Sequence, residues 1–407
     1  MFRPKRAPFL PATADRDAVA NANALTARWA RTHRRGNVVF SGLGCWVLLA
    51  LLASGAHGRA RSELESATGV PAEHSIDAAA ELFALLGNAP AVRAAFGLWS
   101  TVVLDPQWCA RLPSGVTGKL TGDPGVDQAV IDRWVEEATG GAVDALPLEL
   151  TRDTVLLLAS SLSARTEWVE PFDEGAGPGE GSWAQQGLTW CVGSTPEVDR
   201  LHIFETDVGE VTLLRVPGMG GVDVHLVRAG AGVEPGAALA AGIDALAAPA
   251  ARSGIDLGWR DQPPGVQVER LDSTEPWDHL AIRVPAFRAE ASHNLLHQKA
   301  VFGLDAASDA TQGHFPGISA EPLAVAQASQ RVTAEFSATG FRAAAVTAMG
   351  MLVGAAPLTH TAKVRRITVS FDEPFGFVAT HRPSSLILVA GWVDDPASGA
   401  GSDQAAR

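Results

Sequence analysis

The most informative stretch of this sequence is Gln330-Arg-Val-Thr-Ala-Glu-Phe-Ser-Ala-Thr-Gly340. Alternate positions on one side are apolar: Val332, Ala334, Phe336 and Ala338. The intervening positions are mostly polar: Arg331, Thr333, Glu335, Ser337 and Thr339. Because successive side chains of a strand point to opposite faces, this period of two predicts a strand with one buried face. Gly340 then permits a sharp change of direction.

An unusual run follows the predicted strand: Phe341-Arg-Ala-Ala-Ala-Val-Thr-Ala-Met-Gly-Met-Leu-Val-Gly-Ala-Ala-Pro357. It has too little charge for a surface helix and too little Gly, Pro and Asn for an ordinary loop. The pattern alone favours a buried helix or core strand, since Ala is a good helix former. The other interpretation is a long functional loop whose small side chains would fit between neighbouring strands.

The rest of the chain divides into a helical half and a strand-rich half. Helices are predicted from Ser41 through the apolar run to Ala53 and from Asp127 to Thr139, and a buried strand from Thr154 to Ser163. From Leu188 onward short strands predominate without βαβ alternation, which indicates an α+β fold. We expect one domain over residues 15–393, a disordered N-terminal extension (1–14) and a disordered polar tail (394–407).

Composition restricts the partners. The net charge of −13 argues against nucleic acid, which requires a basic surface. The spacings of the three cysteines match no zinc pattern and imply no disulfide framework, and we expect no metal and no cofactor. The basic N-terminus is not followed by an apolar segment, and no apolar run is long enough to span a bilayer. These features favour a cytoplasmic protein without a membrane partner.

Several sequence blocks, in their order and spacing, resemble the serpin family over nearly the whole chain. They are Asn37-Val-Val-Phe-Ser41-Gly-Leu-Gly44, Gly55-Ala-His-Gly58, Ile131-Asp-Arg-Trp-Val135, Trp168 with Pro171-Phe172, Pro285-Ala-Phe-Arg-Ala-Glu290, Phe302-Gly-Leu304, Phe371-Asp-Glu-Pro-Phe375 and Gly391-Trp-Val393. The resemblance, taken as that of a bacterial-type member, implies a large central mixed sheet and two smaller sheets. It also implies eight or nine helices and an exposed reactive-centre loop at about residues 340–363.

The resemblance further implies a suicide inhibitor of endopeptidases rather than an enzyme. In the family a serine-type protease, and in some cases a cysteine-type one, attacks the loop and forms an acyl-enzyme. The cleaved loop then enters the main sheet as a new strand and carries the protease to the far pole. We expect a monomer with an endopeptidase partner, and an extracellular location is also compatible with the family.

Family motifs also assign roles to individual residues. The hinge corresponds to Gly340, Phe341, Arg342, Ala343, Ala344 and Ala345, and the shutter and breach of the sheet to Ser41, Ser160, Gln330 and Trp168. The family usually has a small residue after the hinge glycine. Phe341 is therefore expected to overpack the sheet–helix interface, which typically costs about 1–3 kcal/mol of stability. The shutter histidine and asparagine of the family are replaced by Gln330 and Ser160, which predicts a different hydrogen-bond network.

Two ways of counting place the scissile bond differently. Spacing from Gly340 gives Gly354-Ala355, whereas spacing back from Pro374 gives Lys363-Val364. A bond at Lys363 would leave about nine extra residues, or ~30 Å of slack, and the protease would escape distortion. The candidates are therefore Met351, Leu352, Val353, Gly354 and Ala355, with Leu352 favouring a chymotrypsin-, elastase- or subtilisin-like target. The basic residues Lys363, Arg365 and Arg366 are expected on a solvated strand edge.

Two alternatives remain open. The first is a non-inhibitory serpin-fold binding protein, which Phe341 and Arg342 would favour. The second is an enzyme of another fold, but Gly-x-Ser-x-Gly, His-Glu-x-x-His and P-loop motifs are absent from the sequence. His293 and His297 have the spacing of metal ligands on a helix, and two surface histidines are the simpler interpretation.

Overall fold

The computed structural model describes residues 13–141, 143–179, 181–342 and 362–398. Within these ranges it contains eight α-helices and three β-sheets, so the α+β class is confirmed. The helices are α1 (Thr13–Ala30), α2 (Gly42–Ala53), α3 (Gly58–Thr68), α4 (Ser75–Gly87), α5 (Pro106–Cys109), α6 (Pro124–Thr139), α7 (Pro235–Ala245) and α8 (Lys299–Phe302). None of the helices in these ranges is both long and apolar enough to cross a membrane.

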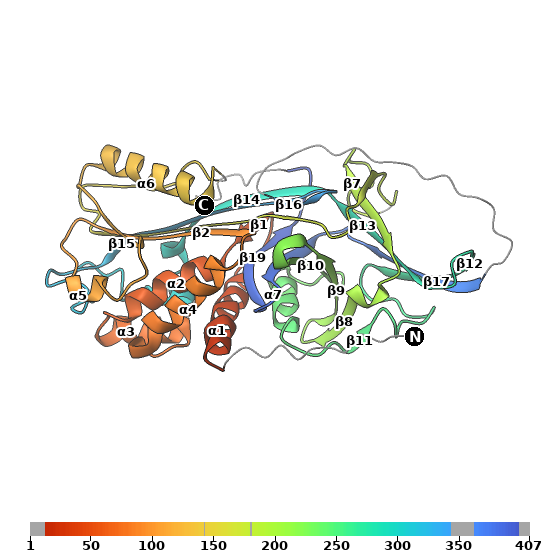
Figure 1. Ribbon diagram of the computed structural model, residues 1–407, viewed down its shortest axis with the longest axis horizontal. Coiled ribbons are helices and arrows are strands. Elements are labelled where there is room, and N and C mark those ends of the chain that lie inside the picture. Colours follow the sequence, from red (N-terminus) through yellow and green to blue (C-terminus); the bar gives the residue numbers. More distant parts are fainter. Residues whose placement is uncertain (1–12, 142, 180, 343–361, 399–407) are drawn as a thin grey trace.

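One of the two seven-stranded sheets is mixed and runs along the length of the molecule (Figure 1); it is here called the central sheet. Its order is β3-β2-β4-β15-β16-β5, and β14 pairs with β15. The strands are β2 (Val92–Ser100), β3 (Thr117–Lys119), β4 (Leu156–Ala164), β5 (Thr166–Glu167), β14 (Phe287–Asn294), β15 (Val325–Phe336) and β16 (Gly340–Arg342). The alternation at Gln330 therefore correctly predicted β15, which starts five residues earlier than expected.

One of the other two sheets contains the last two strands of the chain, and the other contains the strand that begins at Ala362. The C-terminal sheet has the order β1-β19-β18-β10-β9-β8-β11 and the anchor sheet the order β12-β17-β13-β7-β6. Their bounds are β1 (Val38–Phe40), β8 (Leu201–Thr206), β9 (Gly209–Pro217), β10 (Val222–Ala229), β11 (Arg252–Ser253), β18 (Phe375–His381), β19 (Leu386–Val393), β6 (Asp173–Gly175), β7 (Trp190–Thr195), β12 (Val266–Ser273), β13 (His279–Pro285) and β17 (Ala362–Ser370).

The helices cover the central sheet from both sides. Figure 1 shows α6 on one face and α1 to α4 on the opposite face. All twelve residues of α2 are buried, as its uncharged sequence predicted, and the hydroxyl of Ser41 caps this helix by accepting from the N–H of Gly44 (3.2 Å). Helix α6 buries Ile131 and Val135, and its Trp134 packs edge-on against Trp99 of β2 (5.8 Å between ring centroids).

Candidate functional site: hinge, breach and shutter of the central sheet

The described part of the predicted hinge, Gly340–Arg342, is paired as a strand. After β15 the chain turns through residues 337–339 and returns as β16, with Phe336 opposite Phe341 and Glu335 opposite Arg342. On its other side β16 pairs with β5, where Gly340 lies opposite Glu167. A Cβ atom at residue 340 would lie 2.3 Å from the carbonyl oxygen of Thr166, so this close approach requires glycine. Gly340–Arg342 thus occupies an interior position of the central sheet.

Phe341 fills space between two sheets. Its side chain is 1% exposed, and its ring centroid lies 6.1 Å from that of Phe377 on β18. The expectation that Phe341 overpacks the interface with the covering helix is therefore wrong in its geometry. The side chain points to the C-terminal sheet, away from α6, and packs there as an ordinary core residue.

Residues of the breach bind the backbone of the hinge turn, residues 337–339. All three carbonyl groups of the turn accept hydrogen bonds from the segment that follows β5. Trp168 donates its indole N–H to Ser337 (2.8 Å) and its backbone N–H to Thr339 (3.1 Å), and Phe172 N–H donates to Ala338 (2.8 Å). The Trp168 ring is 3% exposed and lies 4.9 Å from the Phe336 ring. The predicted breach tryptophan thus contacts the hinge directly.

The three predicted shutter residues meet in one buried network. The Gln330 side chain accepts from Ser41 N–H (2.8 Å) and donates through Nε2 to Ser41 O (2.9 Å) and Ser160 Oγ (3.0 Å). The Ser41 hydroxyl donates to the carbonyl of Leu388 on β19 (2.7 Å). A Cβ atom at Gly44 would come within 2.8 Å of the Gln330 amide, so this glycine leaves room for the network. Hydrogen bonds therefore join Gln330 to both Ser41 and Ser160.

Below the hinge the central sheet is closed. Strands β4 and β15 pair directly and in parallel from Leu156–Val325 to Leu162–Val332, and Ser160 lies opposite Gln330. Outside this pair, Arg331 donates to Ala145 O (3.2 Å) and Gln327 to Glu149 O (3.1 Å), so the segment after α6 lies across β15. Any strand that continued β16 would have to separate β4 from β15.

Comparison with known proteins identifies the family of the chain. A family model described as serpin (serine protease inhibitor) matches residues 20–178 and 267–396, well over half of the chain. The chain belongs to the serpin family. Serpin-Z2B of Oryza sativa subsp. japonica is 25% identical over 395 residues, covering 89% of this chain and 92% of the relative.

The fold of this serpin is similar to those of two solved structures. Serpin48 of the insect Tenebrio molitor has a TM-score of 0.68 and 18% identity, covering 94% of this chain and 99% of that one. Tengpin, a thermophilic serpin in the native state, has a TM-score of 0.70 and 14% identity, covering 97% of both chains. The expectation of a bacterial-type member is not borne out, because curated relatives that match over most of their length, Serpin-Z2B among them, are plant proteins.

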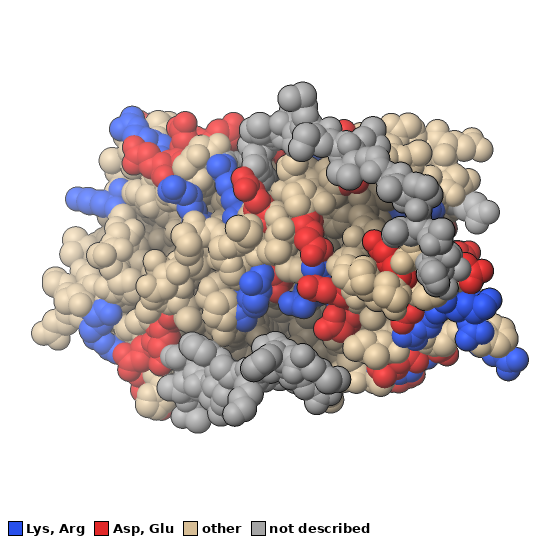
Figure 2. All heavy atoms as spheres, turned by 45° about the vertical axis from the view of Figure 1, so that its right-hand side comes forward, with Lys and Arg blue, Asp and Glu red and all other residues tan. Residues whose placement is uncertain are grey.

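The far end of the reactive-centre loop is anchored in a different sheet. Strand β17 of this serpin lies between β12 and β13, so the prediction that Lys363, Arg365 and Arg366 occupy a strand edge is wrong. Arg365 forms an ion pair with Asp278 (2.7 Å) and is only partly exposed. Acidic and basic side chains are intermixed on the face shown in Figure 2, without a broad basic area.

Two further groups of residues were predicted: part of the loop and a pair of histidines. The hinge residues Ala343 to Ala345 and the scissile-bond candidates Met351 to Ala355 lie outside the described residues. His293 belongs to strand β14 and shares a hydrogen bond with Val39 O (2.8 Å), whereas His297 lies in the following 3₁₀ turn. The two histidines therefore do not share a helix face, and His293 is not the surface residue that was expected, because its ring packs against Trp29 and Phe40.

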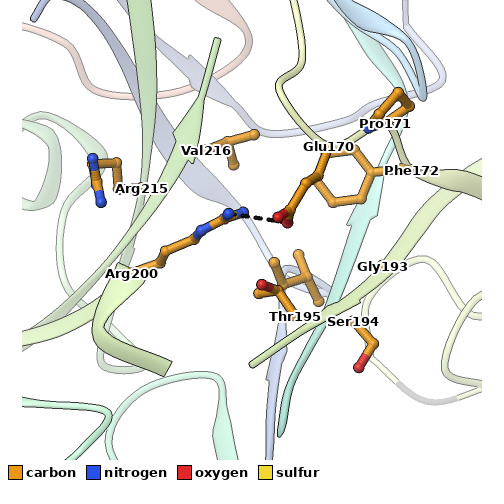
Figure 3. Close-up of a pocket in the computed structure, with 10 residues that line it drawn as sticks. Glu170, Pro171, Phe172, Gly193, Ser194, Thr195, Arg200, Arg215 and Val216 are labelled. Atoms are coloured by element: carbon orange, nitrogen blue, oxygen red, sulfur yellow. Dashed lines mark ion pairs between the residues drawn. The ribbon is translucent and has the colours of Figure 1, made fainter. Parts of the chain in front are cut away.

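Sequence reasoning missed an ion pair beside the breach. Arg200, whose side chain is 6% exposed, binds Glu170 (2.9 Å) and Glu197 (2.7 Å) next to a hollow of about 30 Å³ (Figure 3). Glu170 lies between Trp168 and Phe172, so this pair ties the segment that holds the hinge turn to the start of β8. Nothing in the sequence pairs these residues, because they come from separate connections.

Proposed function

We propose that this serpin inhibits endopeptidases by inserting its cleaved loop into the central sheet. The observation that carries the proposal is the register of β16. The hinge is paired on both sides at the upper end of the sheet, while β4 and β15 meet directly below it. Insertion therefore needs no new nucleus, since it extends an existing antiparallel strand as β4 and β15 separate.

The same register supports the proposed scissile region. If each further loop residue pairs with the preceding residue of β15, Leu352 lies opposite Val325, the first residue of that strand. From Arg342 to Leu352 the inserted strand would cover about ten residues, or ~33 Å. A protease attached within Met351–Ala355 would thus travel the length of the sheet. Lys363 is itself paired within β17, which disfavours cleavage there.

Side-chain chemistry matches along this register. The core-facing residues of β15 are apolar except Gln330, and the loop residues on the Phe341 face are apolar except Thr347. The register places Thr347 opposite Gln330, next to the buried shutter network. A hydroxyl there would have hydrogen-bonding partners, whereas the small Ala343 and Ala345 would lie opposite Ala334 and Val332. These matches favour loop insertion over the non-inhibitory alternative.

The chemistry belongs to the protease. Its nucleophile would attack the carbonyl carbon at the scissile bond, forming an acyl-enzyme ester (or a thioester with cysteine) as the peptide C–N bond breaks and the new amine takes up a proton. The protein supplies the substrate loop and the mechanical displacement. Leu352 and its apolar neighbours favour chymotrypsin-, elastase- or subtilisin-like targets. The alternative of a binding protein is weakened by the buried position of Phe341.

A gel assay tests this function. The protein is incubated with chymotrypsin, elastase, subtilisin and trypsin, and the products are separated by denaturing electrophoresis and identified by mass spectrometry. We expect a denaturant-stable complex with an apolar-specific protease and a C-terminal peptide released by a cut within Met351–Ala355. Complete cleavage by every protease without any complex would instead establish a serpin-fold protein that does not inhibit these enzymes.

A further inference from the structure

A second cavity lies on the C-terminal sheet, far along the chain from the reactive-centre loop. It has a volume of about 270 Å³ and lies where α7 ends against strands β8, β9 and β10. Strand residues that face the helix form its floor, and Leu246 with the short alanine-rich segment after α7 forms its wall. This volume is close to the lower end of the range for ligand sites, so it suits a molecule of roughly a dozen non-hydrogen atoms.

The lining of this cavity has two chemically different halves. Phe204, Leu213 and Leu246 supply apolar surface, and Phe204 and Leu213 are 8% and 3% exposed. The other half carries nitrogen groups from His202, Arg215 and His225. The pairing of His202 with Leu213 and of His225 with Arg215 fixes these side chains on one face of the sheet.

Arg215 is the cationic group of the cavity. Its nearest acidic partner is Asp223, at 3.8 Å, and that carboxylate is already bound by Arg382 (2.9 Å). Figure 3 shows the Arg215 guanidinium turned away from the ion pair of Glu170 with Arg200. Burial lowers the pKa of His225 to about 4 and also lowers the pKa of His202, so both rings are neutral at pH 7. The cavity therefore offers one incompletely neutralised guanidinium beside an apolar surface.

We propose that this cavity binds small aromatic carboxylates. The aromatic ring would lie against Phe204, Leu213 and Leu246, and the carboxylate would bind the guanidinium of Arg215, which can donate two parallel hydrogen bonds. Neutral His225 can contribute a further polar contact. Its Nε2 forms a hydrogen bond with Thr380 Oγ1 (3.2 Å), so the contact would be made by its Nδ1. This site is independent of the proposed loop insertion.

Calorimetric titration with a matched pair of probes tests the site. The probes are 4-phenylbutyrate and its neutral analogue 4-phenylbutanamide, at pH 7.5 and low salt. We expect the carboxylate to bind at least about 5-fold more tightly than the amide, as a charge-assisted pair would give. The substitution Arg215→Gln is expected to remove this difference, whereas Arg366→Gln on the exposed part of β17 should preserve it.

A second variant locates the binding. Leu246→Trp fills the cavity from its wall and is expected to abolish binding of both probes while thermal unfolding remains close to that of the wild type. Equal affinity for the two probes in the wild-type protein, or carboxylate binding that survives both Arg215→Gln and Leu246→Trp, would overturn the proposal.

Discussion

At the scale of single residues, Gln330 joins the two strands that must separate. Its amide satisfies both backbone polar groups of buried Ser41 and the hydroxyl of Ser160. Gln330→Ala would leave these groups without partners, at a cost of about 1–3 kcal/mol. We expect a lower midpoint of thermal unfolding at a fixed scan rate. Gln327→Ala removes a less buried amide from the same strand and should have a much smaller effect; equal losses would contradict the role of the shutter.

A substitution of Phe341 distinguishes an ordinary core residue from one that strains the hinge. If it fills the space beside Phe377 without strain, Phe341→Ala creates a cavity and destabilises the native protein by about 3–5 kcal/mol. If it overpacks the hinge, the same substitution raises stability. We expect the destabilisation, measured as the shift in the urea midpoint, with Phe341→Leu intermediate between the two.

The residue pattern predicted that a strand is present at Gln330, but it did not predict the layer to which the side chain of Phe341 points. The alternation after Gln330 correctly gave β15, but it could not say which layer Phe341 faces, because that depends on the turn at residues 337–339 and on β18 from the end of the chain. The shutter contact between Gln330 and Ser160 was suggested by family resemblance, since 170 residues separate them. Arg200 and Glu170 carried no sequence signal at all.

At the scale of elements, β12 sets the strength of the loop anchor. It covers β17 through eight residue pairs, on the side opposite β13. Strand β12 was not predicted from the sequence, because Val266 and Val268 form too short an apolar pattern. Without β12, β17 was expected at an edge of the sheet. An intact loop inserted as far as Leu352 would have about nine residues left to return up the sheet, ~30 Å, so β17 would have to detach.

This geometry predicts the effect of weakening β12. Val268→Pro removes a backbone donor in the middle of the β12–β17 ladder and introduces a local clash. We expect spontaneous loss of inhibitory capacity at 37 °C to become several-fold faster, with little change in the initial inhibition rate. Ser273→Pro, at the end of the strand, serves as the control. An unchanged rate of loss for Val268→Pro would show that β12 does not restrain the anchor.

At the scale of the whole molecule, buried histidines make stability depend on pH. Burial lowers the pKa of His225 to about 4 and also lowers that of His293, whereas the ordinary value is 6.5. Below pH 6.5 the unfolded chain therefore binds protons that the native protein does not, and stability falls as pH decreases toward 4. We expect the unfolding midpoint to fall between pH 7.5 and 5, and to fall less in His225→Gln. An identical decrease in both proteins would exclude a contribution from His225.

Loop insertion is the central claim, and the change in stability on cleavage tests it most directly. The loop is cut within Met351–Ala355 by a protease, the protease is removed, and thermal unfolding is compared before and after the cut. We predict a clear rise in the unfolding temperature for the wild type and no rise for Thr347→Arg, since a charge buried opposite Gln330 would oppose insertion. Thr347→Ser should behave as the wild type. A wild-type protein whose unfolding temperature is unchanged by the cut would contradict the account.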